Sequence, residues 1–176
     1  YVPPEGSKIY LRSNSDDVFN NISQDIAKFL EISPYIALCG DLNSRTGTIN
    51  DVEQVIAGKD SELISILTDN KSQVHRPSTN RMWCSNRQTI DQTHNNFGKE
   101  LINLCKSSGI RIMNGLLNAE KTKNFTCYTP LKSVVDYLLS SKDMFELLLT
   151  FEIGDKLVES DHTPLIFEIM GQAPLN

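Results

Sequence analysis

The sequence predicts an α+β fold in which short sheets are covered by helices. Three observations favour this class: helical periodicity over residues 18–30, a second helical segment from residue 96, and a series of short strand-like runs from residue 110 onward. Helices and strands interleave in the first part, whereas the last third is mainly strands. With 176 residues the chain is long enough for a sizeable core, so we expect one domain over residues 1–176.

The first predicted helix has a regularly spaced apolar face. Its members are Val18, Ile22, Ile26, Phe29 and Leu30. Ser15 is the expected N-cap, and Asp16 and Asp17 in the first turn favour the positive end of the helix. Pro34 lies just past the predicted end.

A continuous apolar run over 35–39 predicts a strand that is buried on both faces, with Cys39 in the core. The run ends at Gly40, so Asp41 and Asn43 are expected at the C-terminal mouth of the strand. Residues 44–95 are polar and show helical periodicity only weakly, over 51–57 and 61–67. We interpret them as a long irregular excursion with short helices, not as a separate domain.

The second helix begins at Asn96, carries Cys105 on its apolar face and is stopped by Gly109. Strands are predicted over 110–113, 125–128, 133–139, 150–153 and 164–169, with a short helix over 142–148. The turn pair Asn114-Gly115 ends the first of these strands. The segment Ser160-Asp161-His162 falls in the loop between the last two.

Composition limits the function classes. A net charge of −5 argues against a broad phosphate-binding surface. No apolar run reaches about 18 residues, so no membrane span is expected. The four cysteines include no C-x-x-C pair, which favours reduced thiols in an intracellular protein, nuclear or cytoplasmic. The chain has no signal-peptide pattern and begins at a tyrosine, so we expect a piece of a longer protein.

Three polar positions stand out because each interrupts an apolar context. Asp41 follows a predicted strand directly, Asp136 lies inside one, and Asp161-His162 lies between two. An unpaired carboxylate inside a strand would cost several kcal/mol. One arrangement satisfies all of them: Asp136 accepts a hydrogen bond from His162 and fixes its tautomer. Asp161 then offers a hard oxygen to Mg²⁺, Asn43 donates to a phosphate oxygen, and Asp41 orients or deprotonates the attacking water. Such a set suits in-line attack of water on a phosphodiester.

Each motif also has an ordinary structural explanation. G-D-x-N is common turn chemistry, S-D-H can cap a turn, and an aspartate within a strand can form a structural ion pair. Their joint occurrence in this order favours the reactive site.

Two weaker groups lie within the polar excursion. The candidate zinc ligands are His75, Cys84 and His94. Their spacings of nine and ten residues match no zinc-finger pattern. A loose basic patch comprises Arg76, Arg81 and Arg87 near Trp83. It suits a nucleic-acid backbone and an unstacked base, but a solvated loop is the favoured interpretation.

The segments Gly40-Asp41-Leu42-Asn43, Ser133-Val134-Val135-Asp136-Tyr137 and Ser160-Asp161-His162 resemble three C-terminal signatures of the endonuclease/exonuclease/phosphatase (deoxyribonuclease I-like) superfamily. The stretch 96–115 is similar to the linker helix and strand of LINE-type retrotransposon endonucleases, and Tyr1-Val2-Pro3-Pro4 resembles the family's Tyr-x-Pro segment. The resemblance implies a four-layer α/β sandwich whose N-terminal part is missing here. It also implies Mg²⁺-dependent (or Mn²⁺-dependent) phosphodiester hydrolysis by a DNA endonuclease of a retrotransposon-like element.

By this resemblance, Asp41 and Asn43 act at the scissile phosphate and its water, and together with Asp161 they belong to the metal environment. Asp136 orients His162, which is the general base or a phosphate-stabilising acid.

Tyr1 is implied to line the active site and contact phosphate, and Thr126 to lie near it as a small hydroxyl. The family's first half supplies an asparagine and the main metal-binding glutamate, which this sequence lacks. We therefore expect marginal stability and slow hydrolysis, or none, from this chain alone. Two alternatives stay open: a phosphatase acting on inositol or lipid phosphates, and a non-catalytic truncated remnant. The stretch 96–115 favours the nuclease.

Overall fold

The computed structural model describes residues 1–11, 17–52 and 82–171. These residues form a mixed helix-and-strand fold with small antiparallel sheets, which confirms the predicted α+β class. The strands are β1 (Ala37–Asp41), β2 (Arg111–Ile112), β3 (Asp136–Ser140), β4 (Leu148–Ile153) and β5 (Leu165–Ile169). The helices are η1 (Lys8–Leu11), α1 (Asp17–Ile32), α4 (Asn96–Ser108), α5 (Ala119–Thr122) and α6 (Lys142–Leu147). One sheet has the order β1-β3-β2, and β4 pairs with β5 in the other.

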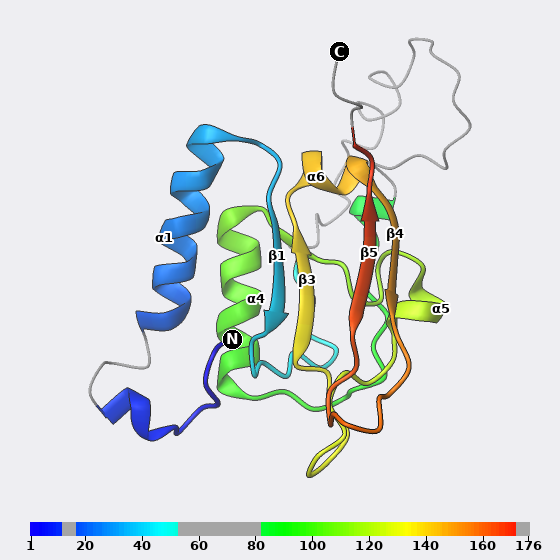
Figure 1. Cartoon of the computed structure of the whole chain (residues 1–176). Helices are drawn as coiled ribbons and strands as arrows, with labels where there is room; N and C mark the ends of the chain where they lie inside the picture. Colours follow the sequence, from blue (N-terminus) through cyan, green and yellow to red (C-terminus); the bar gives the residue numbers. More distant parts are fainter. Residues whose placement is uncertain (12–16, 53–81, 172–176) are drawn as a thin grey trace, which may run out of the picture.

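Strand β3 lies at the centre of the described fold, and every one of its residues is buried. Tyr137 and Leu139 belong to the core cluster that contains the apolar faces of α1 and α4. Leu138, between them, belongs to a second cluster with Phe145 of α6 and Phe151 of β4. Alternate side chains of one strand therefore join two cores. The helix pair α1 and α4 lies on one side of the β1–β3 pair, and β4 and β5 lie on the other (Figure 1).

The observed burial of strand β1 differs from the prediction. The run over 35–39 was expected to be buried on both faces, but β1 is only partly buried and Cys39 is exposed. Among the described residues β1 pairs with β3 alone, so it is an edge strand of its sheet. Its inner face still packs on the helices through Leu38. The fully buried strand of this sheet is β3 instead, and Cys105 is buried as predicted.

The strands predicted over 110–113, 133–139, 150–153 and 164–169 and the helix predicted over 142–148 are present with shifted ends. Residues 125–128 form no continuous strand, because Cys127 makes only isolated bridges to Ser133 and His162. The strand predicted over 110–113 is the two-residue β2, and the one predicted over 133–139 begins at Asp136. The expected cap residues Ser15 and Asp16 lie outside the described residues, as do the helix predicted over 61–67 and most of that over 51–57.

Helix α4 begins and ends as the sequence indicates. The Asn95 side chain accepts a hydrogen bond from the Gly98 amide at 2.7 Å, which caps the N-terminus. Gly109 adopts φ 70° at the C-terminus, a left-handed conformation that glycine adopts without strain. Leu101, Leu104 and other buried residues of α4 pack on the sheet, so the helix supports the strands that carry the candidate site.

We expect Gly98→Ala to destabilise the protein by about 1–3 kcal/mol. A methyl group on Gly98 would lie 1.8 Å from the Arg45 carbonyl oxygen, so the helix would have to move away from the chain that follows β1. Asn103→Ala, at an exposed position of the same helix, is the matched control. Urea denaturation of both variants checks this; equal midpoints would contradict the close approach.

Within the part of the chain that the structure describes, no helix combines the length and apolarity needed to cross a membrane.

Candidate active site

Asp41 and Asp136 face each other across two strands. Asp41 is the last residue of β1 and Asp136 the first of β3, and the register pairs them directly. Side chains at paired positions have Cβ atoms about 4.5–5.5 Å apart, and like charges there repel. Asp136 is 8% exposed, so water screens the repulsion poorly. A positive charge near the two carboxylates would therefore be stabilising.

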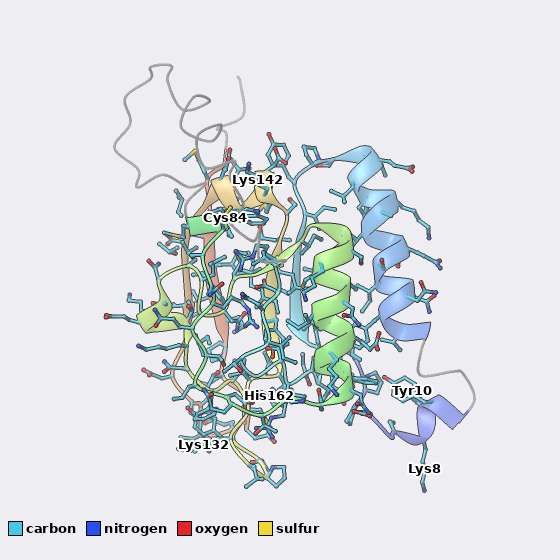
Figure 2. All side chains as sticks on the ribbon, turned by 180° about the vertical axis from the view of Figure 1, so that it is seen from behind. Lys8, Tyr10, Cys84, Lys132, Lys142 and His162 are labelled. Atoms are coloured by element: carbon cyan, nitrogen blue, oxygen red, sulfur yellow. The ribbon has the colours of Figure 1, made fainter. Side chains whose placement is uncertain are left out.

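His162 provides part of that positive charge when its ring is protonated. Its Nδ1 lies 2.8 Å from Oδ2 of Asp136, which confirms the predicted pairing. The hydroxyl of Ser160 accepts a hydrogen bond from the His162 amide at 3.0 Å and holds the turn. Ligand atoms of Asp41, Asp136 and His162 all lie within 4.8 Å of one another. Figure 2 shows His162 at the lower end of the molecule, where β1 ends in Figure 1.

Asn43 completes the turn after β1. Its φ of 47° is left-handed, a region in which asparagine is several-fold enriched. One Asp41 oxygen accepts a hydrogen bond from the Asn43 amide at 2.8 Å, and the other from the Asn43 side-chain Nδ2 at 3.1 Å. The same Nδ2 donates to the Val2 carbonyl at 2.8 Å. Asn43 therefore lies at the site and fixes the orientation of the Asp41 carboxylate.

The N-terminal segment runs beside the site. The Val2 amide donates to the Asp41 carbonyl at 2.9 Å, which places Tyr1 next to this turn along the backbone. The Tyr1 side chain is 83% exposed. A role for it in phosphate contact stays a prediction.

Asp161 lies apart from the two paired aspartates. Its side chain is exposed, and its carbonyl accepts a hydrogen bond from the Tyr128 amide at 2.9 Å. Its carboxylate groups with Cys127 and His162, not with Asp41 and Asp136. Of the predicted metal ligands, Asp41 thus groups with Asp136 and His162, whereas Asp161 groups with Cys127 and His162.

The site shifts the pKa of two groups. Burial raises the pKa of Asp41, and the charge of Asp136 raises it further, although the Asn43 amide and His162 oppose the shift. Partial burial alone would lower the pKa of His162. The hydrogen bond and charge of Asp136, with smaller contributions from Asp41 and Asp161, outweigh burial, so the pKa of His162 is raised.

We expect Asp136→Asn to lower the pKa of His162, because it removes the main group that favours the imidazolium. The raised pKa means that the pair stabilises the fold fully below about pH 6.5, the ordinary His value, and that this stability is lost as pH rises through the folded pKa. NMR titration of the three histidine rings checks the prediction. An unchanged His162 titration in the variant would contradict it.

The donor set fits a hard cation. The Asp41 and Asp136 carboxylates together carry two negative charges around a partly exposed position, and oxygen is the ligand atom that Mg²⁺ prefers. Each of the two carboxylates accepts hydrogen bonds that fix its orientation. A cation between them would relieve the repulsion across the strand pair.

Two buried side chains hold Asp136 in place. The Thr126 hydroxyl accepts hydrogen bonds from the Val135 and Asp136 amides, both at 3.0 Å. The Asn114 Nδ2 donates to the Asp136 carbonyl at 3.0 Å, while its Oδ1 accepts from the Leu138 amide at 3.1 Å. Thr126 was placed near the site by resemblance, and the structure puts it in direct contact with the Asp136 backbone. Asn114 was predicted only as a turn residue, and a single sequence carries no signal for this second role.

We expect Thr126→Val to destabilise the fold by at least about 2 kcal/mol, because two amides lose the hydroxyl that accepts from them. Thr126→Ser keeps the oxygen and is the matched control, with a much smaller loss. Thermal unfolding of both proteins checks this. Equal losses would show that the methyl group matters and the hydrogen bonds do not.

The backbone near Asp136 is also held by an ion pair that the sequence did not predict. Arg45 contacts Asp91 through two nitrogens, at 2.6 and 2.9 Å, and Asp91 accepts a hydrogen bond from the Val134 amide at 3.0 Å. Asn95 accepts from the Arg45 amide and donates to the Asn43 carbonyl, both at 2.9 Å. These contacts tie both described ends of the polar excursion to the site. The partners are far apart in sequence, so no local pattern marks them.

The basic patch predicted around Trp83 is wrong for the residues described. The Arg87 side chain is buried, with its Nε 3.3 Å from the Asp51 carboxylate, so it faces neither solvent nor a nucleic acid. Trp83 packs against Phe145 and under the Arg111 guanidinium. Arg76, Arg81 and His75 lie outside the described residues. Of the other candidate zinc ligands, Cys84 is exposed and His94 bridges Thr46.

No protein-family model, curated protein or solved structure matches this chain.

Proposed function

We propose that this chain carries the reaction centre of a Mg²⁺-dependent phosphodiesterase that hydrolyses DNA. The observation that carries the proposal is the 2.8 Å contact between His162 and Asp136, with Asp41 directly opposite. A carboxylate, an imidazole and a second carboxylate within 4.8 Å can orient water, move a proton and hold a cation.

The His162–Asp136 contact defines the proton-transfer step. When Nδ1 donates its hydrogen to the Asp136 carboxylate, the lone pair of Nε2 remains for a water proton. The imidazolium that forms is stabilised by Asp136, whose charge raises the pKa of His162. Asp136 therefore acts as an orienting partner, and His162 as the general base or, once protonated, as a donor to a phosphate oxygen.

Asp41 and Asn43 complete the centre. The carboxylates of Asp41 and Asp136 would hold Mg²⁺, which when bound would supply positive charge to the phosphate in the transition state. Asn43 fixes both Asp41 oxygens, so the carboxylate enters the reaction already oriented.

The surroundings favour a nucleic acid as substrate. Lys132 and Lys156 have their Nζ atoms 5.5 and 5.2 Å from the Tyr128 ring centroid, and the Tyr128 amide is bonded to Asp161. Ammonium groups suit phosphates, and an aromatic face suits an unstacked base. Figure 2 shows Lys132 at the same end of the molecule as His162. The resemblance of segment 96–115 further supports a DNA endonuclease of a retrotransposon-like element. The four-layer α/β sandwich proposed for the whole domain rests on the resemblance of the three signature segments.

The test is nicking of supercoiled plasmid. One cut converts the whole plasmid to the relaxed form, so slow hydrolysis is detectable. We expect relaxation with Mg²⁺ or Mn²⁺ and none with a chelator. Nicking that persists in the chelator, or phosphate release from inositol phosphates without nicking, would contradict the proposal.

A further inference from the structure

Cys127, Asp161 and His162 form a second group of metal-ligating side chains. One ligand atom from each lies within 4.8 Å of the other two. The group differs from the Asp41–Asp136 pair in containing a thiol. Cys127 is buried, with 7% of its surface exposed, whereas the Asp161 side chain is exposed. The group therefore extends from the protein interior at Cys127 to the surface at Asp161.

The backbone holds the group together. Cys127 and His162 are partners in an isolated antiparallel bridge, which places their side chains next to each other. The neighbouring pair is joined by the bond from the Tyr128 amide to the Asp161 carbonyl at 2.9 Å, and the Thr163 amide donates to the Thr126 carbonyl at 2.9 Å. Three successive residues on one segment are thus matched to three on the other. The ligands do not depend on a loop closing to come together.

The chemistry of the three donors selects a soft cation. Thiolate and imidazole are the main ligands of Zn²⁺, and a carboxylate oxygen is a third ligand type that it accepts in open sites. Bond lengths of about 2.0–2.3 Å around tetrahedral zinc put donor atoms roughly 3.5 Å apart, so small side-chain rotations suffice. The Cys127 thiol makes only a 3.4 Å contact with the Thr129 carbonyl, so little is lost when it turns.

We propose that Cys127, Asp161 and His162 bind Zn²⁺, and that zinc bound there inhibits the reaction at the Asp41–Asp136 side. Binding converts the Cys127 thiol to a thiolate and releases its proton to solvent. Zinc bound to the ring of His162 would prevent the ring from accepting or donating a proton. The same ion would hold the Asp161 carboxylate away from the phosphate. The binding step stands by itself; only the inhibition rests on the proposed function.

Cobalt(II) tests the binding step by its colour. We expect the chain to bind Co²⁺ with a thiolate-to-metal absorption band in the near ultraviolet and with visible bands of tetrahedral intensity, both removed by Zn²⁺. Cys127→Ser loses the ultraviolet band, and Asp161→Asn weakens Co²⁺ binding at least about tenfold. Cys84→Ser is the matched control, since Cys84 is also a free cysteine, and we expect this variant to retain the Co²⁺ spectrum. Asp41→Asn should retain the same spectrum, because Asp41 is not one of the three ligands.

An absent ultraviolet band, or one that Cys84→Ser removes and Cys127→Ser retains, overturns the site. The inhibition has a separate test: micromolar Zn²⁺ slows Mg²⁺-dependent plasmid nicking by the natural chain and leaves the Cys127→Ser variant unaffected. Equal inhibition of both proteins overturns that part. If the chain nicks no plasmid at all, the proposed activity fails for this chain, while the cobalt spectrum still decides whether the metal binds.

Discussion

Replacing His162 by Ala lowers the rate of Mg²⁺-dependent plasmid nicking by at least about a hundredfold, the lower range for loss of a general acid or base. The ring is held by Asp136 at 2.8 Å and lies within 4.8 Å of Asp41, so no other imidazole among the described residues can replace it. We expect a comparable loss from Asp161→Ala, because its charge favours the imidazolium of His162 and the resemblance implies that its carboxylate helps to bind the metal. Initial rates of plasmid relaxation measure both.

His94→Ala is the matched control for the histidine. His94 is exposed, and its backbone forms a bridge with Thr46 that does not need the ring. The control should nick at the natural rate, and unfolding midpoints should show that all the variants are folded. Activity of His162→Ala within a few-fold of the natural chain would remove His162 from the chemistry.

Replacing Asp51 by Ala destabilises the fold by about 3–5 kcal/mol, the range for a broken buried ion pair. The Asp51 side chain is fully buried, 2.8 Å from an Arg111 nitrogen and 3.3 Å from Arg87. It also accepts a hydrogen bond from the Ile112 amide at 2.9 Å. Removing the carboxylate leaves two guanidinium groups buried without their shared counter-ion. Since domains are stable by only about 5–15 kcal/mol, we expect a large shift of the urea midpoint.

Asp25→Ala is the control, because Asp25 forms a 3.0 Å pair with Lys28 in which both side chains are more than half exposed. Its loss should stay within about 0.5 kcal/mol. Burial alone would raise the pKa of Asp51, but the Arg111 hydrogen bond and both arginine charges outweigh it and lower the pKa. The stabilisation is thus present above about pH 3.9, the ordinary Asp value, and lost as pH falls through the folded pKa. Equal losses from Asp51→Ala and Asp25→Ala would contradict a buried charge network.

The parts of the site that could be predicted are those with a local signal. Asp136 was assigned a partner because an unpaired carboxylate in an apolar strand is costly, and His162 was the partner chosen; the structure confirms the pair. The C-terminal end of α4 was predictable because Gly109 is a typical helix stop, and its start because the apolar periodicity begins after Asn96.

The rest depends on contacts between residues distant in sequence. Cys39 was predicted as core because an apolar run does not reveal that its strand lies at a sheet edge. Arg87 was interpreted as a surface residue because its counter-ion, Asp51, is distant in sequence. The Arg45–Asp91 pair was missed for the same reason. Such ion pairs form only after the chain has folded, and polar residues in an irregular segment give no sign of them.

In the proposed reaction centre, Asp41, Asp136 and His162 surround one cation and one phosphate. A crystal of this chain soaked in Mn²⁺, with the ion located by its anomalous scattering, shows whether they do. We predict a peak about 2.0–2.3 Å from carboxylate oxygens of both Asp41 and Asp136, with His162 still hydrogen-bonded to Asp136. A peak bound elsewhere, or a His162–Asp136 separation beyond about 6 Å, too long for a hydrogen bond, would contradict it.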